Sequence, residues 1–385
     1  MENLGVITTD IKKNIYFNLF IIKTFCSTIF LDYLFPIDII NFIFKLYYNL
    51  IDIKLFSFEY GKRFNILIDY HLYECKFSKE KYFGRSDVSK IYKNDKKIQF
   101  YSSDGKNSFI LTNEGLFGKG ENRYGQLGLG EFGSVDDFKK IYINFSVKSI
   151  SITKFFTYIQ TKEDYLYSCG TNHYYLLLNK FKESPNFNSC YFDNTNYKVI
   201  QYSCATDHSL ILTKETLYGF GSNDYFQLGK FTRNDRYNGH YYINQVFNIN
   251  KIISFQCNTR CSFILMTDGL YSTGQNTYGQ LGHGTCSNIY NFTFIKNLND
   301  ILSFNIFPNN SLVLTKNGLY GCGSIFIFNI NYTIFTKIDI QNIISYNCTI
   351  MDLIIINDQG FYRSDNRYYE SLETKQKLEL IKIKF

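Results

Sequence analysis

Short apolar runs of four to six residues, separated by polar turns, recur along most of the chain. In one clear copy they occupy residues 199–202, 209–213 and 217–221, with a polar turn at 205–207 between the first two. The following copies repeat this order at 252–255, 262–266 and 270–274, and then at 301–304, 311–315 and 319–323. Runs of β-branched and aromatic residues bounded by turn residues are typical of β-strands. The pattern therefore predicts an all-β structure built from repeated strands.

A leucine followed by an aromatic residue marks the third run of each copy, with phenylalanine replacing leucine once. The pair occurs seven times, and its second residues are 44, 50, 51, 53, 49 and 42 positions apart. A period near 50 is typical of propeller blades or stacked units. The seven pairs are Leu72-Tyr73, Leu116-Phe117, Leu166-Tyr167, Leu217-Tyr218, Leu270-Tyr271, Leu319-Tyr320 and Phe361-Tyr362.

A fourth apolar stretch follows most copies, at residues 140–144, 242–247, 292–295, 333–338 and 378–385. Four short strands per copy and seven copies over residues 51–385 predict a seven-bladed β-propeller of four-stranded antiparallel blades. We expect the last stretch, 378–385, to pair with strands of the first copy, because closing the ring removes free sheet edges.

Three copies carry a longer glycine-rich signature after the anchor pair, at residues 116–130, 217–229 and 270–284. Together with the preceding segment 207–213, these signatures resemble the repeat of the regulator of chromosome condensation family. The third copy keeps only Gly170 and Asn172, and the end copies have drifted most. The repeat glycines are Gly118, Gly120, Gly125, Gly128, Gly170, Gly219, Gly221, Gly229, Gly274, Gly279, Gly282 and Gly323.

These glycines favour a structural interpretation over a phosphate-binding one. Glycine permits positive φ and a close approach between backbones. A phosphate cradle at Gly118-Lys119-Gly120 would require a following helix, whereas another strand and loop follow each time. The tyrosines of the signatures, Tyr124, Tyr225 and Tyr278, are expected to pack between neighbouring blades.

The first fifty residues differ from the rest and form a separate predicted domain, residues 1–50. Residues 15–34 are rich in apolar side chains, but Lys23 and Asp32 oppose insertion in a membrane. A signal peptide is opposed by the lack of a small-residue cleavage site. Ile39, Ile43, Leu46 and Leu50 recur at helical spacing. The sequence therefore predicts a short α-helical segment of two packed helices and no membrane span.

The second of these helices also resembles the opening of an F-box. Pro36, Asp38, Ile39 and the pair Ile43-Phe44 carry the resemblance. It implies docking on the Skp adaptor of a ubiquitin ligase, with apolar anchors three and four apart filling a groove. The first propeller strand, near Ile53, begins before the remaining helices of an F-box would end. The alternative is a helical hairpin that packs against the propeller.

Charge and composition narrow the partner classes. The net charge is +7, from 41 basic and 34 acidic residues, and the lysines are scattered among the turns. Nucleic-acid binding is not expected, because a basic patch or stripe is its electrostatic footprint. The abundance of 34 Tyr and 38 Phe with no Trp indicates an AT-rich coding sequence rather than a mechanism.

The ten cysteines follow the repeat. Cys204, Cys257 and Cys348 lie at equivalent places after the first strand, which is the pattern of small buried apolar residues. Cys257 and Cys261 form a close pair, but no second pair at zinc spacing accompanies it. We expect reduced thiols, no metal and an intracellular location in the cytoplasm or nucleus.

No catalytic centre is evident, so we expect neither an enzyme nor a cofactor. His71, His173, His208, His240 and His283 follow no metal spacing, and no nucleophile elbow is present. His208 falls where neighbouring copies have other residues, which favours a turn or packing role. The sequence therefore favours a protein–protein interaction scaffold for an unknown protein client, which the F-box-like helix could deliver to a ubiquitin ligase.

The alternative function is guanine-nucleotide exchange on a Ran-like small GTPase, which is the activity of the best-known member of the family that the repeats resemble. Exchange in that protein uses a protruding β-wedge. The intervals of 42 to 53 residues leave no copy with obvious spare length for a wedge, so the scaffold is preferred.

The turns between first and second strands are the candidate binding surface. They recur at residues 103–106, 206–208, 258–260 and 308–310, and they should reach one common rim. Their variation from copy to copy fits either a surface that selects a partner or unconstrained change in solvent. The candidate residues for partner binding are Lys106, Asp207, His208, Arg260 and Asn310 on the rim, with Pro36, Ile39, Ile43 and Phe44 on the N-terminal helix.

Overall fold

The computed structural model describes residues 54–59, 63–68, 71–76, 87–90, 97–179, 181–191, 197–229, 240–242, 248–325, 330–338, 343–348, 353–357 and 360–363. The predicted helical segment 1–50, including Pro36, Ile39, Ile43 and Phe44, lies outside these residues. The predicted closing strand at 378–385 lies outside them as well.

The described residues form seven antiparallel sheets in which each strand pairs with its neighbour in sequence. Six sheets have four strands and the seventh has three in the described part. The bounds are β1–β4 (Lys54–Glu59, Arg63–Ile68, His71–Lys76, Asp87–Lys90), β5–β8 (Ile98–Ser103, Ser108–Thr112, Gly115–Gly120, Val135–Ile141), β9–β12 (Val147–Ile152, Phe156–Thr161, Leu166–Thr171, Glu183–Ser189), β13–β16 (Val199–Cys204, His208–Thr213, Leu217–Gly221, His240–Tyr242), β17–β20 (Ile252–Asn258, Cys261–Met266, Gly269–Gly274, Ile289–Phe294), β21–β24 (Ile301–Ile306, Asn310–Thr315, Gly318–Ile325, Ile330–Ile338) and β25–β27 (Ile343–Cys348, Leu353–Asn357, Gly360–Arg363). Two single-turn 3₁₀ helices occupy His173–Tyr175 and Ile249–Lys251.

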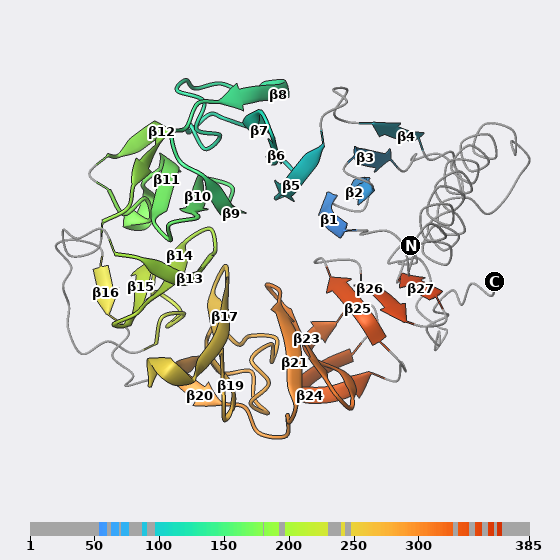
Figure 1. Cartoon of the computed structure of the whole chain (residues 1–385). Coiled ribbons are helices and arrows are strands. Elements are labelled where there is room, and N and C mark those ends of the chain that lie inside the picture. Colours follow the sequence, from blue (N-terminus) through green and yellow to red (C-terminus); the bar gives the residue numbers. More distant parts are fainter. Residues whose placement is uncertain are drawn as a thin grey trace, which may run out of the picture.

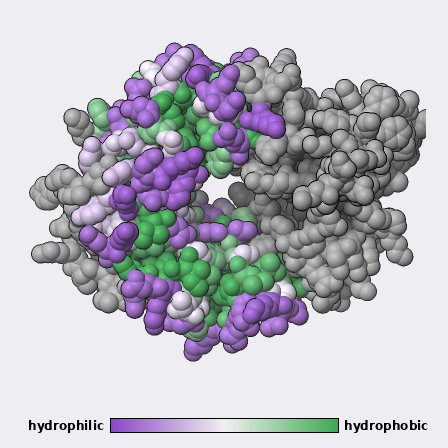
Figure 2. All heavy atoms as spheres, in the orientation of Figure 1, coloured by the Kyte–Doolittle hydropathy of each residue, from purple (hydrophilic) through white to green (hydrophobic). Residues whose placement is uncertain are grey.

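The seven sheets are the blades of a propeller, as the sequence predicts. Figure 1 shows them arranged around a ring, with the first strand of each blade innermost. First strands of neighbouring blades contact one another from β1 through β5, β9, β13 and β17 to β21. In the space-filling view the described atoms border an opening at the centre of the ring (Figure 2).

The core lies between blades rather than inside a single sheet. All six residues of β10, β14 and β18 are buried, because the second strand of a blade is covered on both faces. One cluster joins Leu210 and Leu228 of the fourth blade to Phe255, Ile264 and Phe292 of the fifth. Burial of such apolar area is the main stabilising contribution to the ring.

The first three strands of the clear copies lie where the sequence predicts them, but the outer strand β8 does not. It spans Val135–Ile141 rather than 140–144. The outer strand β16, His240–Tyr242, meets the predicted stretch 242–247 at Tyr242, and residues 243–247 lie outside the described residues. β8 buries only Ile141; Val135 and Phe138 are partly buried, and its other four residues are exposed. Because the outermost strand has one free edge and one solvated face, it lacks the continuous apolar run that marks an inner strand.

The signature loops fasten each blade to the next. The side-chain oxygens of Asn122, Asn223 and Asn276 accept the backbone N–H of Leu127, Leu228 and Leu281 at 2.9, 2.8 and 2.8 Å. The amide nitrogens of Gln126 and Gln280 donate to the carbonyls of Lys154 and Pro308 in the next blade, at 3.3 and 3.2 Å. The signature is therefore a junction between blades, which agrees with its structural interpretation.

Ten of the twelve repeat glycines have positive φ, while Gly118 and Gly219 do not. Gly118 serves close packing instead, since a Cβ there would lie 3.1 Å from Cδ1 of Ile141. At Gly128, with φ +68°, a Cβ would lie 2.2 Å from the ring of Phe187 in the next blade. Close approach between blades, as much as backbone conformation, explains the repeated glycines.

Candidate functional site

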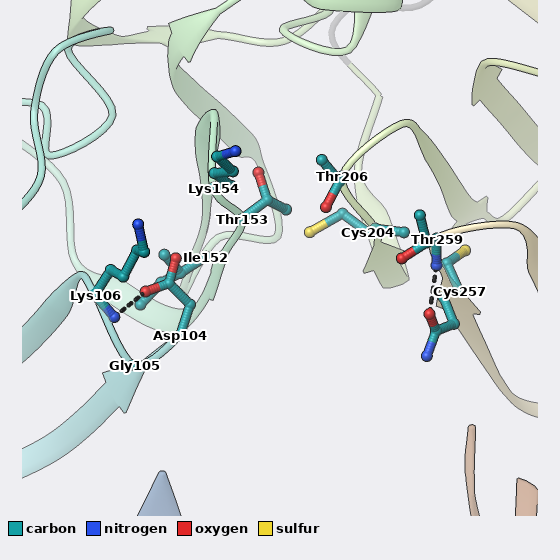
Figure 3. Close-up of a pocket in the computed structure, with 12 residues that line it drawn as sticks. Asp104, Gly105, Lys106, Ile152, Thr153, Lys154, Cys204, Thr206, Cys257 and Thr259 are labelled. Carbon is teal, nitrogen blue, oxygen red and sulfur yellow. Dashed lines mark hydrogen bonds between the residues drawn. The ribbon is translucent and has the colours of Figure 1, made fainter. Parts of the chain in front are cut away.

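The turns that follow the first strands gather at one mouth of the propeller. Turns from the second, third, fourth and fifth blades line a common recess of about 430 Å³, and Lys106, Lys154, Thr206 and Thr259 represent the four turns. Figure 3 shows Lys106 and Lys154 on one side of this space and Thr206 and Thr259 on the other. We call the turns 104–107, 153–155, 205–207 and 259–260 the rim.

Local hydrogen bonds shape the first two rim turns. Oδ1 of Asp104 accepts the backbone N–H of Lys106 at 2.9 Å and that of Asn107 at 2.6 Å, which is an Asx turn. Burial raises the pKa of the Asp104 carboxyl, and these hydrogen bonds oppose the rise. Oγ1 of Thr153 accepts the N–H of Phe156 at 3.1 Å. Each turn thus has a defined shape before any partner binds.

Backbone hydrogen bonds from the end of each third strand fix the position of the rim turns. The residue after the strand glycine donates its N–H to a turn carbonyl, as in Thr171 to Phe155, Ser222 to Asp207 and Gln275 to Arg260, at 3.0, 2.7 and 2.9 Å. A Cβ at Gly221 would lie 2.2 Å from the Asp207 carbonyl oxygen. The repeat glycines therefore position the rim turns as well as the blades.

Only part of the predicted rim set is available to a partner. The side chain of Lys106 is 50% exposed and Arg260 is also exposed, whereas the side chain of Asp207 is only 18% exposed. His208 and Asn310 are 0% and 4% exposed, so their assignment as contact residues is wrong. Each begins a second strand; the His208 ring reaches Ser262 of the next blade, and Nδ2 of Asn310 donates to the Ser324 carbonyl of its own blade.

Comparison with solved structures finds propellers of similar fold. The fold is similar to that of Prp20p from Saccharomyces cerevisiae, with a TM-score of 0.62 and 17% identity over 81% of this chain and 80% of that one. Human WBSCR16 gives a TM-score of 0.62 and 18% identity over 79% of this chain and 87% of that one. Yeast RCC1 (Prp20) bound to Kap60 gives 0.60 and 18%, over 72% of each chain.

The chain has the propeller fold of the regulator of chromosome condensation. No family model matches the sequence, and no curated protein matches it. At this level of identity the similarity establishes the fold. The function of this RCC1-type propeller has to be argued from its own residues.

The buried His208 joins two blades of the RCC1-type propeller. Its Nδ1 lies 3.0 Å from Oδ1 of Asp207, and its Nε2 lies 2.8 Å from Oγ of Ser262 in the next blade. The order Asp, His, Ser matches that of a hydrolase triad. However, His208 and Ser262 are both fully buried, so no substrate can reach the hydroxyl in this conformation. The His208 ring therefore links the fourth and fifth blades by hydrogen bonds, an arrangement that we call the clasp. This agrees with the packing role that the sequence predicts for His208.

The sequence missed the rim turn of the third blade. Lys154 lies in this turn, and its Nζ lies 5.0 Å from the centre of the Phe155 ring. The third copy has lost most of the glycine-rich signature, so the sequence did not show that its turn is equivalent to the rim turns of the other copies. The one available signal was spacing, because Lys154 follows Asp104 by one repeat length.

Two signature tyrosines pack across blade junctions, as predicted. The Tyr124 ring lies 5.5 Å from that of Phe155 in the next blade, in an edge-on geometry. The Tyr225 ring lies 4.5 Å from the guanidinium carbon of Arg260, also in the next blade. Tyr278 is 43% exposed. Aromatic rings of the signature loops therefore support rim residues of the following blade.

The opposite mouth of the RCC1-type propeller presents a different surface. Ile200, Ile253 and Leu302 are 52, 57 and 58% exposed. Each is the second residue of a first strand and is skipped in the pairing register, which identifies a β-bulge. The sequence placed them in apolar runs, and therefore gave no sign that they face solvent.

The cysteines are mostly packing residues. Cys169, Cys190, Cys261 and Cys322 are buried, and no disulfide joins any cysteine in the described part of the chain. Cys204 and Cys257 line the recess, and burial raises the pKa of the Cys204 thiol to about 12. Such a thiol stays protonated near neutral pH, as a packing residue does.

Neither a metal centre nor a membrane-spanning helix occurs among the described residues. There, no three His, Cys, Asp or Glu side chains come together as a metal site. No helix in the same part of the chain is long and apolar enough to span a membrane.

Proposed function

We propose that this protein is a non-enzymatic interaction scaffold that holds a protein client on the rim of its propeller. The proposal rests on one observation: four turns from different blades line one recess. Their side chains differ from blade to blade, while the strands that carry them repeat. A rigid scaffold with variable turns is a common way to build a binding surface.

The test is a pulldown from the native cell with two matched variants. One changes the rim residues Lys106, Lys154 and Arg260 together to serine, and the other changes Ile200, Ile253 and Leu302 at the opposite mouth to serine. We expect the rim variant to lose the client by about tenfold or more, because central contact residues dominate binding energy, and the opposite variant to keep it. A folded rim variant that recovers every wild-type partner would exclude the rim.

The N-terminal segment supplies a second part of the proposal. Pro36, Ile39, Ile43 and Phe44 resemble F-box anchors, so we propose that the segment delivers the client to a ubiquitin ligase through a Skp-type adaptor. Co-purification with the Skp adaptor tests this, with Ile39→Asp and Ile43→Asp as the disrupting changes. Without co-purification, a helical hairpin packed on the propeller is the better interpretation.

Guanine-nucleotide exchange is the competing function. The solved structure of Prp20p is described together with its binding to Gsp1p and histones, and this chain shares its fold. Release of mant-GDP from a panel of Ran-type GTPases distinguishes the two. A scaffold leaves the release rate unchanged, whereas an exchange factor accelerates it.

A further inference from the structure

On the rim side of the propeller, the acidic side chains have more polar partners within the protein than the basic ones do. The cationic side chains at this mouth are Lys106, Lys154 and Arg260 on the rim and Arg123 in the adjoining signature loop. Acidic side chains near them are Asp104, Glu121 and Asp207. The two sets differ in how far they are already engaged.

The acidic groups are paired internally. Asp104 accepts the backbone N–H groups of its own turn. Asp207 lies 3.0 Å from the His208 ring. Glu121 accepts from Nζ of Lys106 at 2.7 Å. Each of the three acidic side chains is therefore already engaged with a neighbouring group, and Asp104, which itself lines the recess, accepts N–H groups of its own turn.

Three of the cations have no carboxylate partner among the described residues. Lys154, Arg260 and Arg123 instead lie over the rings of Phe155, Tyr225 and Tyr124, at 5.0, 4.5 and 5.9 Å. Arg260 also donates a long hydrogen bond of 3.4 Å to Oε1 of Gln275. A ring beneath a cation limits its motion but leaves its outer N–H groups available for an anion.

The repeat places these supported cations at blade junctions. Tyr124 and Phe155 meet where the second blade adjoins the third, and Tyr225 meets Arg260 where the fourth adjoins the fifth. These two junctions flank the recess that the rim encloses. Lys154 lines that recess, and so does Thr259, the neighbour of Arg260.

We propose that the rim recognises an acidic peptide segment of its client, with carboxylates placed against Lys154 in the recess and against Arg260 at its edge. This deepens the proposed function by naming the chemistry of the client. Thr206 and Thr259 offer hydroxyl groups on the opposite wall. The volume of about 430 Å³ suits a few side chains of an extended peptide. Because the cations are held in place beforehand, binding costs little side-chain entropy.

The experiment measures fluorescence anisotropy of a labelled oligoglutamate peptide, with oligoglutamine and oligolysine peptides of equal length as comparisons. The variant is Lys154→Ser with Arg260→Ser. The control is Lys140→Ser with Lys316→Ser, which removes the same net charge from the outer strand β8 and from the turn after β22.

We expect the wild-type protein and the control to bind oligoglutamate with similar affinity, weakening with salt, and the variant to bind about tenfold or more weakly. Equal weakening in variant and control would show that only net charge matters, and would overturn the proposal. Equal affinity for oligoglutamine would overturn it too.

Failure here is separable from failure of the scaffold. If the rim variant loses the client in the pulldown but the wild-type protein shows no preference for oligoglutamate, the scaffold proposal stands and the acidic-peptide proposal is rejected. A client that persists on the rim variant rejects the scaffold itself.

Discussion

Replacing Gly274 with valine should destabilise the protein by about 3 kcal/mol or more. Gly274 has φ +114°, a conformation that side chains rarely adopt, and a Cβ there would lie 2.4 Å from the carbonyl oxygen of Arg260 and 2.7 Å from Cα of Cys261. Both are backbone atoms of the rim turn and of β18, so neither can rotate away. The loss should appear in denaturant unfolding as a lower midpoint.

A second glycine separates the two causes of that loss. Gly133 has φ +106°, but a Cβ at this position would have no atom within 4 Å. Gly133→Val should therefore cost only the conformational strain, about 1 to 2 kcal/mol. If Gly274→Val and Gly133→Val unfold at the same midpoint, the close approach of strand and rim turn contributes nothing. Gly120, Gly221 and Gly323 make equivalent approaches and should behave like Gly274.

Replacing His208 with alanine should cost about 2 to 4 kcal/mol. The change removes two side-chain contacts, leaves a void between the fourth and fifth blades, and deprives the buried hydroxyl of Ser262 of its ring partner at 2.8 Å. Asp207 also loses its partner. Thermal or denaturant unfolding measures the loss.

His283→Ala is the matched control for His208→Ala. His283 contacts Oγ of Ser272 at 2.8 Å but is only half-buried, so its loss should cost less, about 1 kcal/mol. An equal effect of the two changes would mean that His208 is not a clasp between blades. Wild-type stability for His208→Ala would have the same meaning.

Periodicity predicted the inner strands of the clear copies and the place of the rim turns, because buried strands need continuous apolar runs and turns interrupt them. The bounds of outer strands such as β8 were not predicted, because a strand with a solvated face and a free edge lacks a continuous apolar run. The sequence also could not predict that the side chains of His208 and Asn310 are buried. Second strands are buried on both faces, so alternation of polar and apolar residues does not indicate which side chains face a turn or a neighbouring blade.

Contacts between blades were the least predictable feature of the candidate site. The resemblance to repeats of known propellers explained the glycines as structural but not which backbone atoms they approach. Lys154 was missed because its copy had lost the signature. Arg260 lies over the Tyr225 ring of the preceding blade, and this contact depends on the packing of neighbouring blades, which no single repeat encodes.

The central claim is that the client lies on the rim, and hydrogen exchange with the captured client bound tests it most directly. We predict slower exchange in peptides covering the turns 104–107, 153–155, 205–207 and 259–260, with unchanged exchange around the bulges at Ile200, Ile253 and Leu302. Slower exchange at those bulges, with the rim turns unaffected, would contradict the account.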